Sequence, residues 1–320
     1  MKVKFFGTRG SIAVSGPGNV IYGGNTTSLS VDSECLPDGF ALVVDTGSGF
    51  VPLAGEALKK GVRNMLILYS HYHFDHTIGL TMAGVTYIKN IKISAYGPEE
   101  HGIGPAQMME DLFKPPYFPV DYREVSSHIV AKGVDLPNSR VFVLHRQGGV
   151  KYLTIDQFES LELNGMMVPF EKGQKFNLGE CLVIRMYRSN HPERTISYRF
   201  EERSTGKVFV FLTDHENQDG MPWRLLRHVE GAHLLVMDAQ YERERYDGGT
   251  AGYGHGTPDY CVRVALKAKA VSLGLTHHDP NATDMKIEAI VAEAEEARVS
   301  QAPEGKLSIF ACRDYQEVEL

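Results

Sequence analysis

The chain has 320 residues, of which 42% are hydrophobic, so it is long enough to bury one large layered core or two smaller ones. Its formal net charge of −7 argues against a protein that works mainly by neutralising long stretches of nucleic-acid backbone. Extended nucleic acid is therefore not an expected partner, although a local basic pocket is compatible with this charge.

Four widely separated cysteines form no C-x-x-C pair, which predicts reduced thiols rather than a zinc knuckle or a disulfide framework. The N-terminal sequence reaches Gly7 and Arg9 too early for the apolar core of a signal peptide. No apolar run of about 18 residues occurs anywhere in the sequence. The sequence therefore predicts a cytoplasmic protein that does not associate with membranes.

Short β-prone runs open the chain at residues 2–6, 27–32 and 40–45, with glycine-rich or polar turns between them. Helical spacing follows at 51–60. An apolar run at 65–69 is typical of a strand buried on both faces. Residues 98–175 show no clear period and are interpreted as an elaboration on the core.

Regular patterns return after residue 181. They predict strands at 182–187, 196–200, 208–213, 233–237 and 270–276, and helices at 222–229, 258–269 and 284–298. Because strands and helices alternate in both halves, we expect a single layered α/β domain over residues 1–320, with functional loops at strand ends. In each half an apolar strand runs into an aspartate, Asp45 in the first and Asp214 in the second.

The densest group of metal-ligand side chains begins two residues after the apolar run at 65–69, and consists of His71, His73, Asp75 and His76. Four polar groups beside a buried strand need partners. Imidazole and carboxylate groups without thiolates suit zinc or another borderline divalent ion. Alternate residues of an extended turn project to one side, so His71 and His73 can hold one ion while the other two serve a second.

Two ions need more ligands, and the chain offers them at the ends of three later strands. His191 follows the strand at 182–187, and Asp214 closes the strand at 208–213. The adjacent His277 and His278 close the strand at 270–276. A sheet would deliver all of these side chains to one edge.

These motifs resemble the metallo-β-lactamase superfamily, whose signature is an H-x-H-x-D-H segment followed by a distant histidine, a bridging aspartate and a last histidine. Further segments resemble a bacterial branch related to phosphodiesterase-like and tRNase Z-like members: 7–11, 22–26, 117–120, 254–257 and 277–280. The likeness spans most of the chain except residues 126–170. It implies an α/β (α+β) fold, a four-layer αββα sandwich of two mixed sheets flanked by helices.

The resemblance also implies how the ligands divide between two divalent ions. The first ion is assigned His71, His73 and His191, the second Asp75, His76 and His277, and Asp214 bridges them. His277 is preferred to His278 because family members place the ligand directly after the strand-ending Leu-Thr. Zinc is the expected metal, and the same ligands accept manganese or iron.

Two divalent ions about 3.5–4 Å apart can share a hydroxide and lower its pKa towards neutrality. On this interpretation the bridging hydroxide attacks a phosphodiester, with Asp75 and Asp214 among the catalytic residues. His255 is the candidate acid for the departing alkoxide, or a phosphate contact. The resemblance supplies the substrate class, a cyclic nucleotide or a short nucleic-acid end, whereas the residues indicate only hydrolysis.

Other polar residues have weaker patterns. Arg9 is a candidate for a substrate phosphate or for pairing with an acidic neighbour, and His278 is a further candidate substrate contact. Arg224 and Arg227, three residues apart on the helix at 222–229, are interpreted as a solvated face. The remaining histidines receive no role: His101, His128, His145, His228 and His233.

The run Asp45-Thr46-Gly47-Ser48 also occurs in aspartic proteases. Such an enzyme needs two carboxylates that share a proton, and residues 213–216 do not supply the second motif. As the resemblance implies, Asp45 is therefore assigned a role behind the ligands or in fixing a loop. The glycines around His255 lack the G-K-[ST] ending of a P-loop, which argues against a nucleotide cradle of that kind.

Alternative functions remain open at this point. A thioester or lactone hydrolase would use the same ligands but would have an apolar acyl channel beside them, and a third alternative is a non-catalytic, metal-stabilised binding module. A redox diiron role is disfavoured because the oxygen-reducing branch has glutamate at the position of His73. Residues 126–170 are a candidate substrate-binding or dimer-forming arm, so a homodimer is among the expectations.

Overall fold

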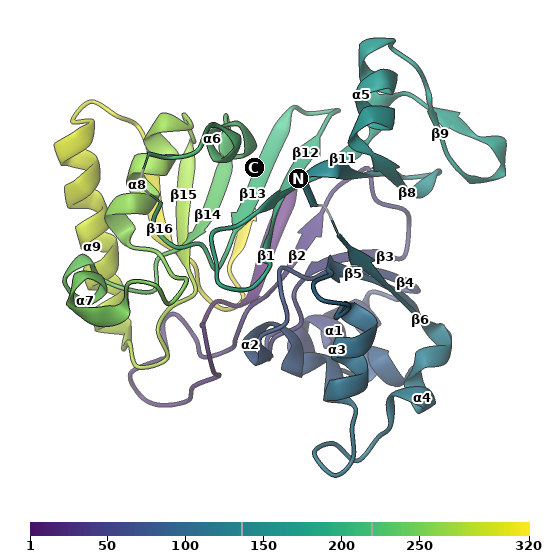
Figure 1. The fold of residues 1–320 in the computed structure, drawn as a ribbon, viewed down its shortest axis with the longest axis horizontal. Helices are drawn as coiled ribbons and strands as arrows, with labels where there is room; N and C mark the ends of the chain where they lie inside the picture. The colour runs from purple at the N-terminus through teal and green to yellow at the C-terminus, as the bar shows by residue number, and fades with distance from the viewer. Residues whose placement is uncertain (136, 219) are drawn as a thin grey trace.

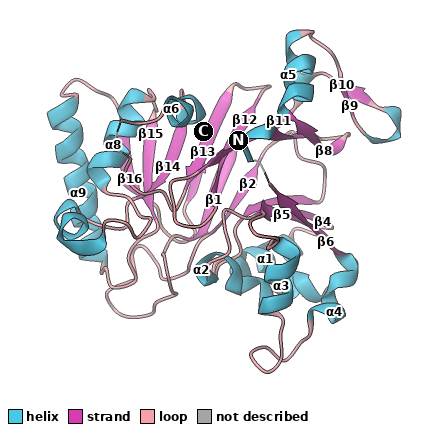
Figure 2. Cartoon of the chain, in the orientation of Figure 1, coloured by secondary structure: helices cyan, strands magenta, loops and turns pink. Residues whose placement is uncertain are grey.

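The computed structural model describes residues 1–135, 137–218 and 220–320. Two mixed β-sheets face each other, and helices cover their outer faces (Figures 1 and 2). The four-layer architecture expected from the sequence is therefore confirmed.

The first sheet has seven strands, and β3 to β6 are parallel. Because they run in one direction, the carboxyl ends of β3 and β4 meet at the same edge. In sheet order the strands are β17 (Glu317–Glu319), β1 (Lys2–Gly7), β2 (Ser28–Asp32), β3 (Phe40–Val44), β4 (Asn64–Leu68), β5 (Lys92–Pro98) and β6 (Ile129–Val134).

The second sheet has eight strands, and its parallel part runs from β13 to β16. The carboxyl ends of these strands again lie at one edge. In sheet order the strands are β16 (Ser308–Ala311), β15 (Ser272–Thr276), β14 (Leu234–Asp238), β13 (Lys207–Leu212), β12 (Ile196–Glu202), β11 (Leu182–Arg188), β7 (Arg140–His145) and β8 (Gly149–Thr154).

The helices cover the outer faces. On the outer face of the first sheet lie α1 (Phe50–Lys59), α3 (Pro105–Leu112) and α4 (Tyr122–Val125), and α2 (Phe74–Thr77) follows β4 along the chain. Associated with the second are α5 (Ile155–Leu163), α6 (Trp223–Val229), α7 (Arg243–Arg245), α8 (Pro258–Lys267) and α9 (Asp284–Gln301).

The alternating direction of strand side chains explains why β3 and β4 are apolar throughout. Leu42 and Leu66 belong to the core between the two sheets, whereas Val43 and Ile67 pack in the core beneath α1. Strands buried on both faces have no polar side, so they appear in the sequence as continuous apolar runs.

Residues 98–175 contain more regular structure than the sequence pattern predicted. Strand β6 extends the first sheet, and β7 and β8 extend the second, so this segment passes from one sheet to the other. A separate two-stranded ribbon, formed by β9 (Val168–Pro169) and β10 (Lys175–Phe176), follows α5. The expectation of an irregular segment is corrected accordingly.

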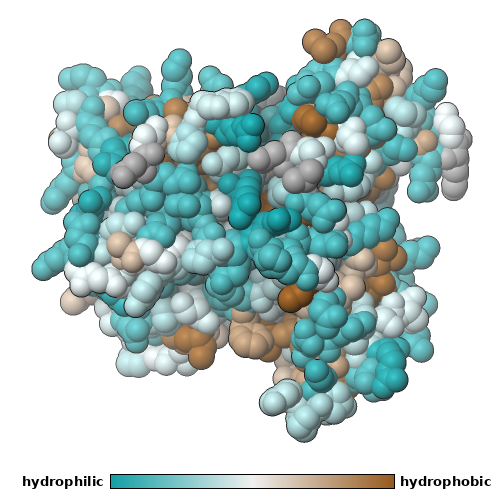
Figure 3. Space-filling model, in the orientation of Figure 1, coloured by the Kyte–Doolittle hydropathy of each residue, from teal (hydrophilic) through white to brown (hydrophobic). Residues whose placement is uncertain are grey.

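Among the described residues, the helices are too short or too polar for any of them to cross a membrane. The face of the molecule in Figure 3 is mainly hydrophilic, and its apolar residues form small separate patches. All four cysteines are buried and free.

Candidate metal centre

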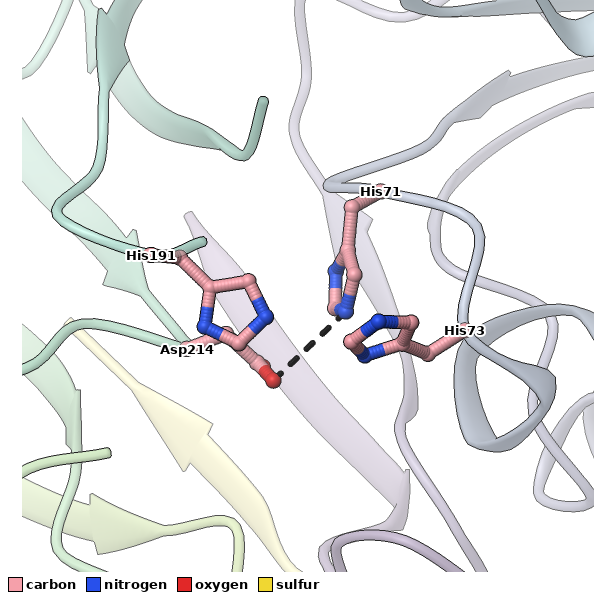
Figure 4. A group of neighbouring side chains, drawn as sticks. All are labelled: His71, His73, His191 and Asp214. Carbon is pink, nitrogen blue, oxygen red and sulfur yellow. Dashed lines mark ion pairs between the residues drawn. The ribbon is translucent and has the colours of Figure 1, made fainter. Parts of the chain in front are cut away.

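The structure brings the seven implied ligands together from both halves of the chain. One group contains His71, His73, His191 and Asp214, and a second contains Asp75, His76 and His277. Within each group, one ligand atom from every residue lies within 4.8 Å of all the others. Figure 4 shows His71 and His73 facing His191 and Asp214 across the first group.

The ligands nearest the N-terminus sit where β4 gives way to α2. His71 and His73 lie on the intervening loop, and Asp75 and His76 lie within the helix itself. The backbone N–H of His76 donates to the carbonyl of His73 at 3.0 Å, which turns the chain sharply after the second histidine. This turn separates the four side chains between the two groups.

Two later ligands follow parallel strands of the second sheet directly. Asp214 lies just beyond β13 and His277 just beyond β15, with β14 between these strands. Both have left-handed backbones, with φ of +48° and +62°. Such conformations cost about 1–3 kcal/mol outside glycine and persist at functional sites that the surrounding structure fixes. The chain therefore uses strained turns to direct both side chains to the same edge.

The Nδ1 atom of each buried ligand histidine has a hydrogen-bond partner, which leaves Nε2 facing the centre. The acceptors are Ser70 Oγ for His71 (3.1 Å), Asp45 Oδ2 for His76 (2.8 Å), Gly254 O for His191 (3.0 Å) and Gln240 Oε1 for His277 (2.8 Å). Such contacts fix the tautomer that metal-binding histidines require.

Two of these inward-facing atoms, Nε2 of His71 and Nε2 of His191, are buried and have no hydrogen-bond partner among the residues that the structure describes. Leaving a buried polar atom unpaired costs roughly 1–3 kcal/mol. A divalent ion would satisfy both atoms, so the residues present fit a metal ion.

A family model described as a β-lactamase superfamily domain matches residues 41–278, a range that includes all seven ligands. The chain belongs to the metallo-β-lactamase superfamily. Together with the buried histidine and aspartate groups, this membership makes the chain a metal-dependent hydrolase of the metallo-β-lactamase fold. No curated protein matches the sequence significantly.

Solved structures of this fold match over the whole chain at low identity. The metallo-β-lactamase fold protein YhfI from Bacillus subtilis has 17% identity and a TM-score of 0.62, with coverage of 100% of this chain and 99% of its own. Human tRNase Z, short form, has 17% identity, a TM-score of 0.57 and the same coverage. Yeast PDE1 has 12% identity, a TM-score of 0.59 and again the same coverage. These likenesses show the fold alone.

Buried aspartates raise the pKa values of two histidine ligands in the second group. Burial alone would lower the pKa of His277, but Asp214 and Asp75 outweigh it and raise the pKa to about 9. The pKa of His76 is likewise raised by Asp75 and Asp214 against the effect of burial. Without metal, both imidazoles therefore hold protons at neutral pH.

We expect metal uptake to release protons, because a histidine must be neutral to bind an ion. At pH 7 the metal-free protein should lose at least the proton of His277, whereas above about pH 9 that proton is already absent. The apparent metal affinity should therefore rise as pH increases from 7 to 9. Calorimetric titration in buffers of different ionisation enthalpy measures the release directly, and an affinity that fell over this range would contradict the prediction.

Asp45 lies behind the second group and has the supporting role expected from the sequence. Its carboxylate accepts from the backbone N–H and Oγ of Ser70, both at 2.7 Å, and from Nδ1 of His76 at 2.8 Å. Asp45 is fully buried and left-handed, with φ of +56°. It therefore fixes the orientations of Ser70, directly before the ligand segment, and of the ligand His76.

Replacing Asp45 by asparagine should weaken metal binding by about 10–100-fold. Asparagine tolerates the left-handed backbone, but its amide can donate to Nδ1 of His76 and so favour the tautomer whose Nε2 carries the proton. A matched control is Asp284→Asn, since Asp284 is also buried and accepts from the backbone N–H groups of Val20, Ile21 and Tyr22. Competition with a chromophoric chelator measures both, and equal losses would refute a specific role for Asp45.

The side chains of the proposed substrate contacts Arg9 and His278 are engaged by backbone carbonyls. Arg9 is fully buried, and its guanidinium donates to the carbonyls of Gly23, Asp279 and Ala282. His278 is also fully buried, and its Nε2 contacts the carbonyl of Cys312 at 2.8 Å. Both side chains hold loops together, so neither is available to a substrate.

His255 lies at the edge of the second group. Its ring stacks on that of His277 at 4.8 Å between centroids, and its Nδ1 contacts Asp238 Oδ2 at 2.8 Å. It also forms a third potential ligand group with Asp214 and His277. Because Nδ1 donates to Asp238, Nε2 is the atom of His255 that remains available for chemistry.

Several supporting residues were missed by the sequence analysis. The backbone N–H of Ser11 donates to Asp75 Oδ2 at 2.7 Å, and a Cβ on Gly10 would lie 2.4 Å from the ring of His277. The turn at 7–11 therefore supports ligands instead of binding a phosphate through Arg9. Glu193 is another residue at the site that the sequence pattern did not single out. Its Oε2 lies 3.2 Å from Nε2 of His73 and 3.3 Å from Nε2 of His191. Its position two residues after a ligand was the available signal.

Proposed function

We propose that the protein is a phosphodiesterase that uses two divalent metal ions, zinc or else manganese or iron. The observation that carries this proposal is the position of Asp214 between the two ligand groups. Its Oδ1 lies 3.3 Å from Nε2 of His76, and its Oδ2 lies 3.6 Å from Nε2 of His71 and 3.4 Å from Nε2 of His277. A carboxylate so placed can serve an ion on either side.

In this assignment the first ion would be held by His71, His73, His191 and Asp214, and the second by Asp75, His76, His277 and Asp214. Two divalent ions bound there would lower the pKa of water and polarise a phosphoryl group. Of the ligands, His73 is exposed, whereas the others are buried. The substrate therefore approaches from the side of His73.

His255 is the candidate proton donor to the leaving group. Asp238 is fully buried and accepts from Nδ1 of His255, so it fixes the orientation of the ring and leaves Nε2 available to the leaving group. Proton donation to an alkoxide is needed for esters with poor leaving groups. Structural neighbours named tRNase Z and PDE1 support phosphate esters as the substrate class.

The test compares hydrolysis of bis-p-nitrophenyl phosphate with that of a thioester and a lactone by the metal-loaded protein. His73→Ala should strongly reduce the phosphodiesterase activity, and because this side chain is exposed, its removal leaves the packing of the core unchanged. His101→Ala, at another exposed histidine, is the matched control. Hydrolysis of the lactone or thioester alone would instead support the acyl-ester alternative, and metal binding without any turnover would support a binding module.

A further inference from the structure

A large groove crosses the outer face of the second sheet, apart from the metal ligands. Its volume is about 930 Å³, and residues of β11, β12, α5 and α6 line it. Figure 1 shows α5 and α6 standing apart on either side of this part of the sheet. The outward residues here are polar, such as Arg185 and Arg199, in contrast to the apolar outward residues of β13 to β15 beneath α8. The groove is therefore solvated and not a gap in the core.

Arginines dominate the lining of this groove, which we call the arginine groove. Seven arginines and four acidic residues line it: Arg140, Arg185, Arg188, Arg194, Arg199, Arg224 and Arg227, with Asp135, Glu159, Glu201 and Glu230. Glu201 is neutralised within the sheet, because it pairs with Arg185, Arg199 and Arg203. Arg185 and Arg194 also pair with Glu162 and Glu100, which lie outside the lining. The positive charge of the groove therefore comes mainly from Arg140, Arg188, Arg224 and Arg227, in a protein of net charge −7.

Three of these arginines are available to a ligand. The side chains of Arg188, Arg224 and Arg227 are exposed and make no hydrogen bond or ion pair with any residue that the structure describes. Beside them Trp223 is 63% exposed, and the guanidinium of Arg224 lies 5.5 Å from the centroid of its ring. The pair expected to be only a solvated face, Arg224 and Arg227, therefore forms one wall of a groove together with an exposed aromatic ring.

One end of the groove lies close to the metal centre along the chain. Arg188 and Arg194 both line the groove, and each is three residues from the ligand His191. Three residues span at most about 11 Å even when fully extended. The backbones of both arginines therefore lie within about 11 Å of the backbone of His191, which places this part of the groove near the metal centre.

We propose that the arginine groove binds the backbone of a single-stranded oligonucleotide whose end reaches the metal centre, an inference that rests on the proposed phosphodiesterase function. Guanidinium groups form bidentate contacts with phosphates, and exposed aromatic rings stack on bases. An acidic peptide would satisfy the arginines but would leave the face of Trp223 unused. The acidic net charge of the protein limits the fit to a few nucleotides.

The single tryptophan of the chain provides a direct readout, since it lies at the rim of the groove. Titrating metal-loaded, full-length protein with a hydrolysis-resistant phosphorothioate hexathymidylate should quench Trp223 fluorescence, and the affinity should fall as salt is raised. The double variant Arg224→Gln/Arg227→Gln should bind at least about tenfold more weakly and show a smaller salt dependence. The matched control is Arg123→Gln/Arg146→Gln, which removes the same charge from two exposed arginines outside the groove.

Equal losses in both double variants, absence of quenching at low salt, or equally tight binding of a polyglutamate peptide would each overturn the proposal. A dimer that the wild type forms and the groove variant does not form would assign the groove to a second copy of the chain instead. Hydrolysis of bis-p-nitrophenyl phosphate without oligonucleotide binding would reject the proposed role of the groove and leave the proposed phosphodiesterase function intact. Arginine-dependent binding by a protein that hydrolyses no phosphate ester would support the groove and reject the proposed function.

Discussion

Replacing Asp214 by alanine should reduce phosphodiester hydrolysis by at least about a thousandfold and should release metal from both ligand groups. The two carboxylate oxygens of Asp214 lie within 3.3–3.6 Å of Nε2 atoms in His71, His76 and His277. Alanine would leave these buried imidazoles without their shared counter-charge, and the pKa values of His76 and His277 are raised by that charge. The loss should therefore exceed that of any single histidine ligand.

Metal content by mass spectrometry and turnover of bis-p-nitrophenyl phosphate should be measured on the same preparation. Asp111→Ala is a suitable control, because the Asp111 side chain is 60% exposed on α3 and makes only an exposed hydrogen bond with Gln107 at 3.3 Å and an ion pair with Lys114 at 4.0 Å. Circular dichroism would show whether the variant retains the fold. A variant that kept its fold, both metals and its activity would rule out Asp214 as the shared ligand.

The ligand positions could be predicted because each follows an apolar strand that the sequence makes visible. His71 comes after the run at 65–69, and Asp214 and His277 each come directly after another buried strand. The structure also places His277, and not its neighbour His278, within a ligand group. The left-handed turn at His277 directs its side chain to the centre, while His278 packs against Tyr22 and the carbonyl of Cys312.

The residues that orient the ligands were harder to predict because their partners are distant in sequence or belong to the backbone. Arg9 binds carbonyls of Asp279 and Ala282, about 270 positions later, and carbonyls leave no mark on side-chain patterns. Asp238 did leave a signal, since it ends the apolar strand β14 just as Asp45 and Asp214 follow theirs. That repeated pattern identifies three aspartates at the site.

The strands of residues 98–175 could not be predicted for a related reason. The segment of β7 is almost entirely buried, and although its partner β8 follows directly, its other partner β11, which joins it to the rest of the second sheet, begins about 40 residues later. Short strands are stabilised by cross-strand contacts more than by intrinsic preference. Without the position of β11, the local sequence therefore gives no clear period.

The loss of turnover in His255→Ala should depend on how strongly the leaving group of each substrate requires protonation. For an alkyl phosphodiester we expect turnover to fall by about 10²–10⁴-fold, because the alkoxide must be protonated as it departs. For bis-p-nitrophenyl phosphate the loss should be much smaller, since p-nitrophenolate leaves without a proton. Asp238→Asn should also slow turnover of the alkyl phosphodiester more than that of bis-p-nitrophenyl phosphate, but by a smaller factor than His255→Ala. The reason is that the amide cannot balance the charge on the imidazolium of His255.

Metal content distinguishes this role from the competing one in which His255 is itself a ligand beside Asp214 and His277. A proton donor can be removed without loss of metal, and Nδ1 of His255 is already engaged by Asp238. If His255→Ala lost metal and slowed both esters equally, His255 would be a ligand and the proton would have to come from elsewhere. If metal is retained and only the alkyl ester is slowed, the paired His255 and Asp238 account for the departure of the leaving group, and the ligand set remains the seven residues of the two groups.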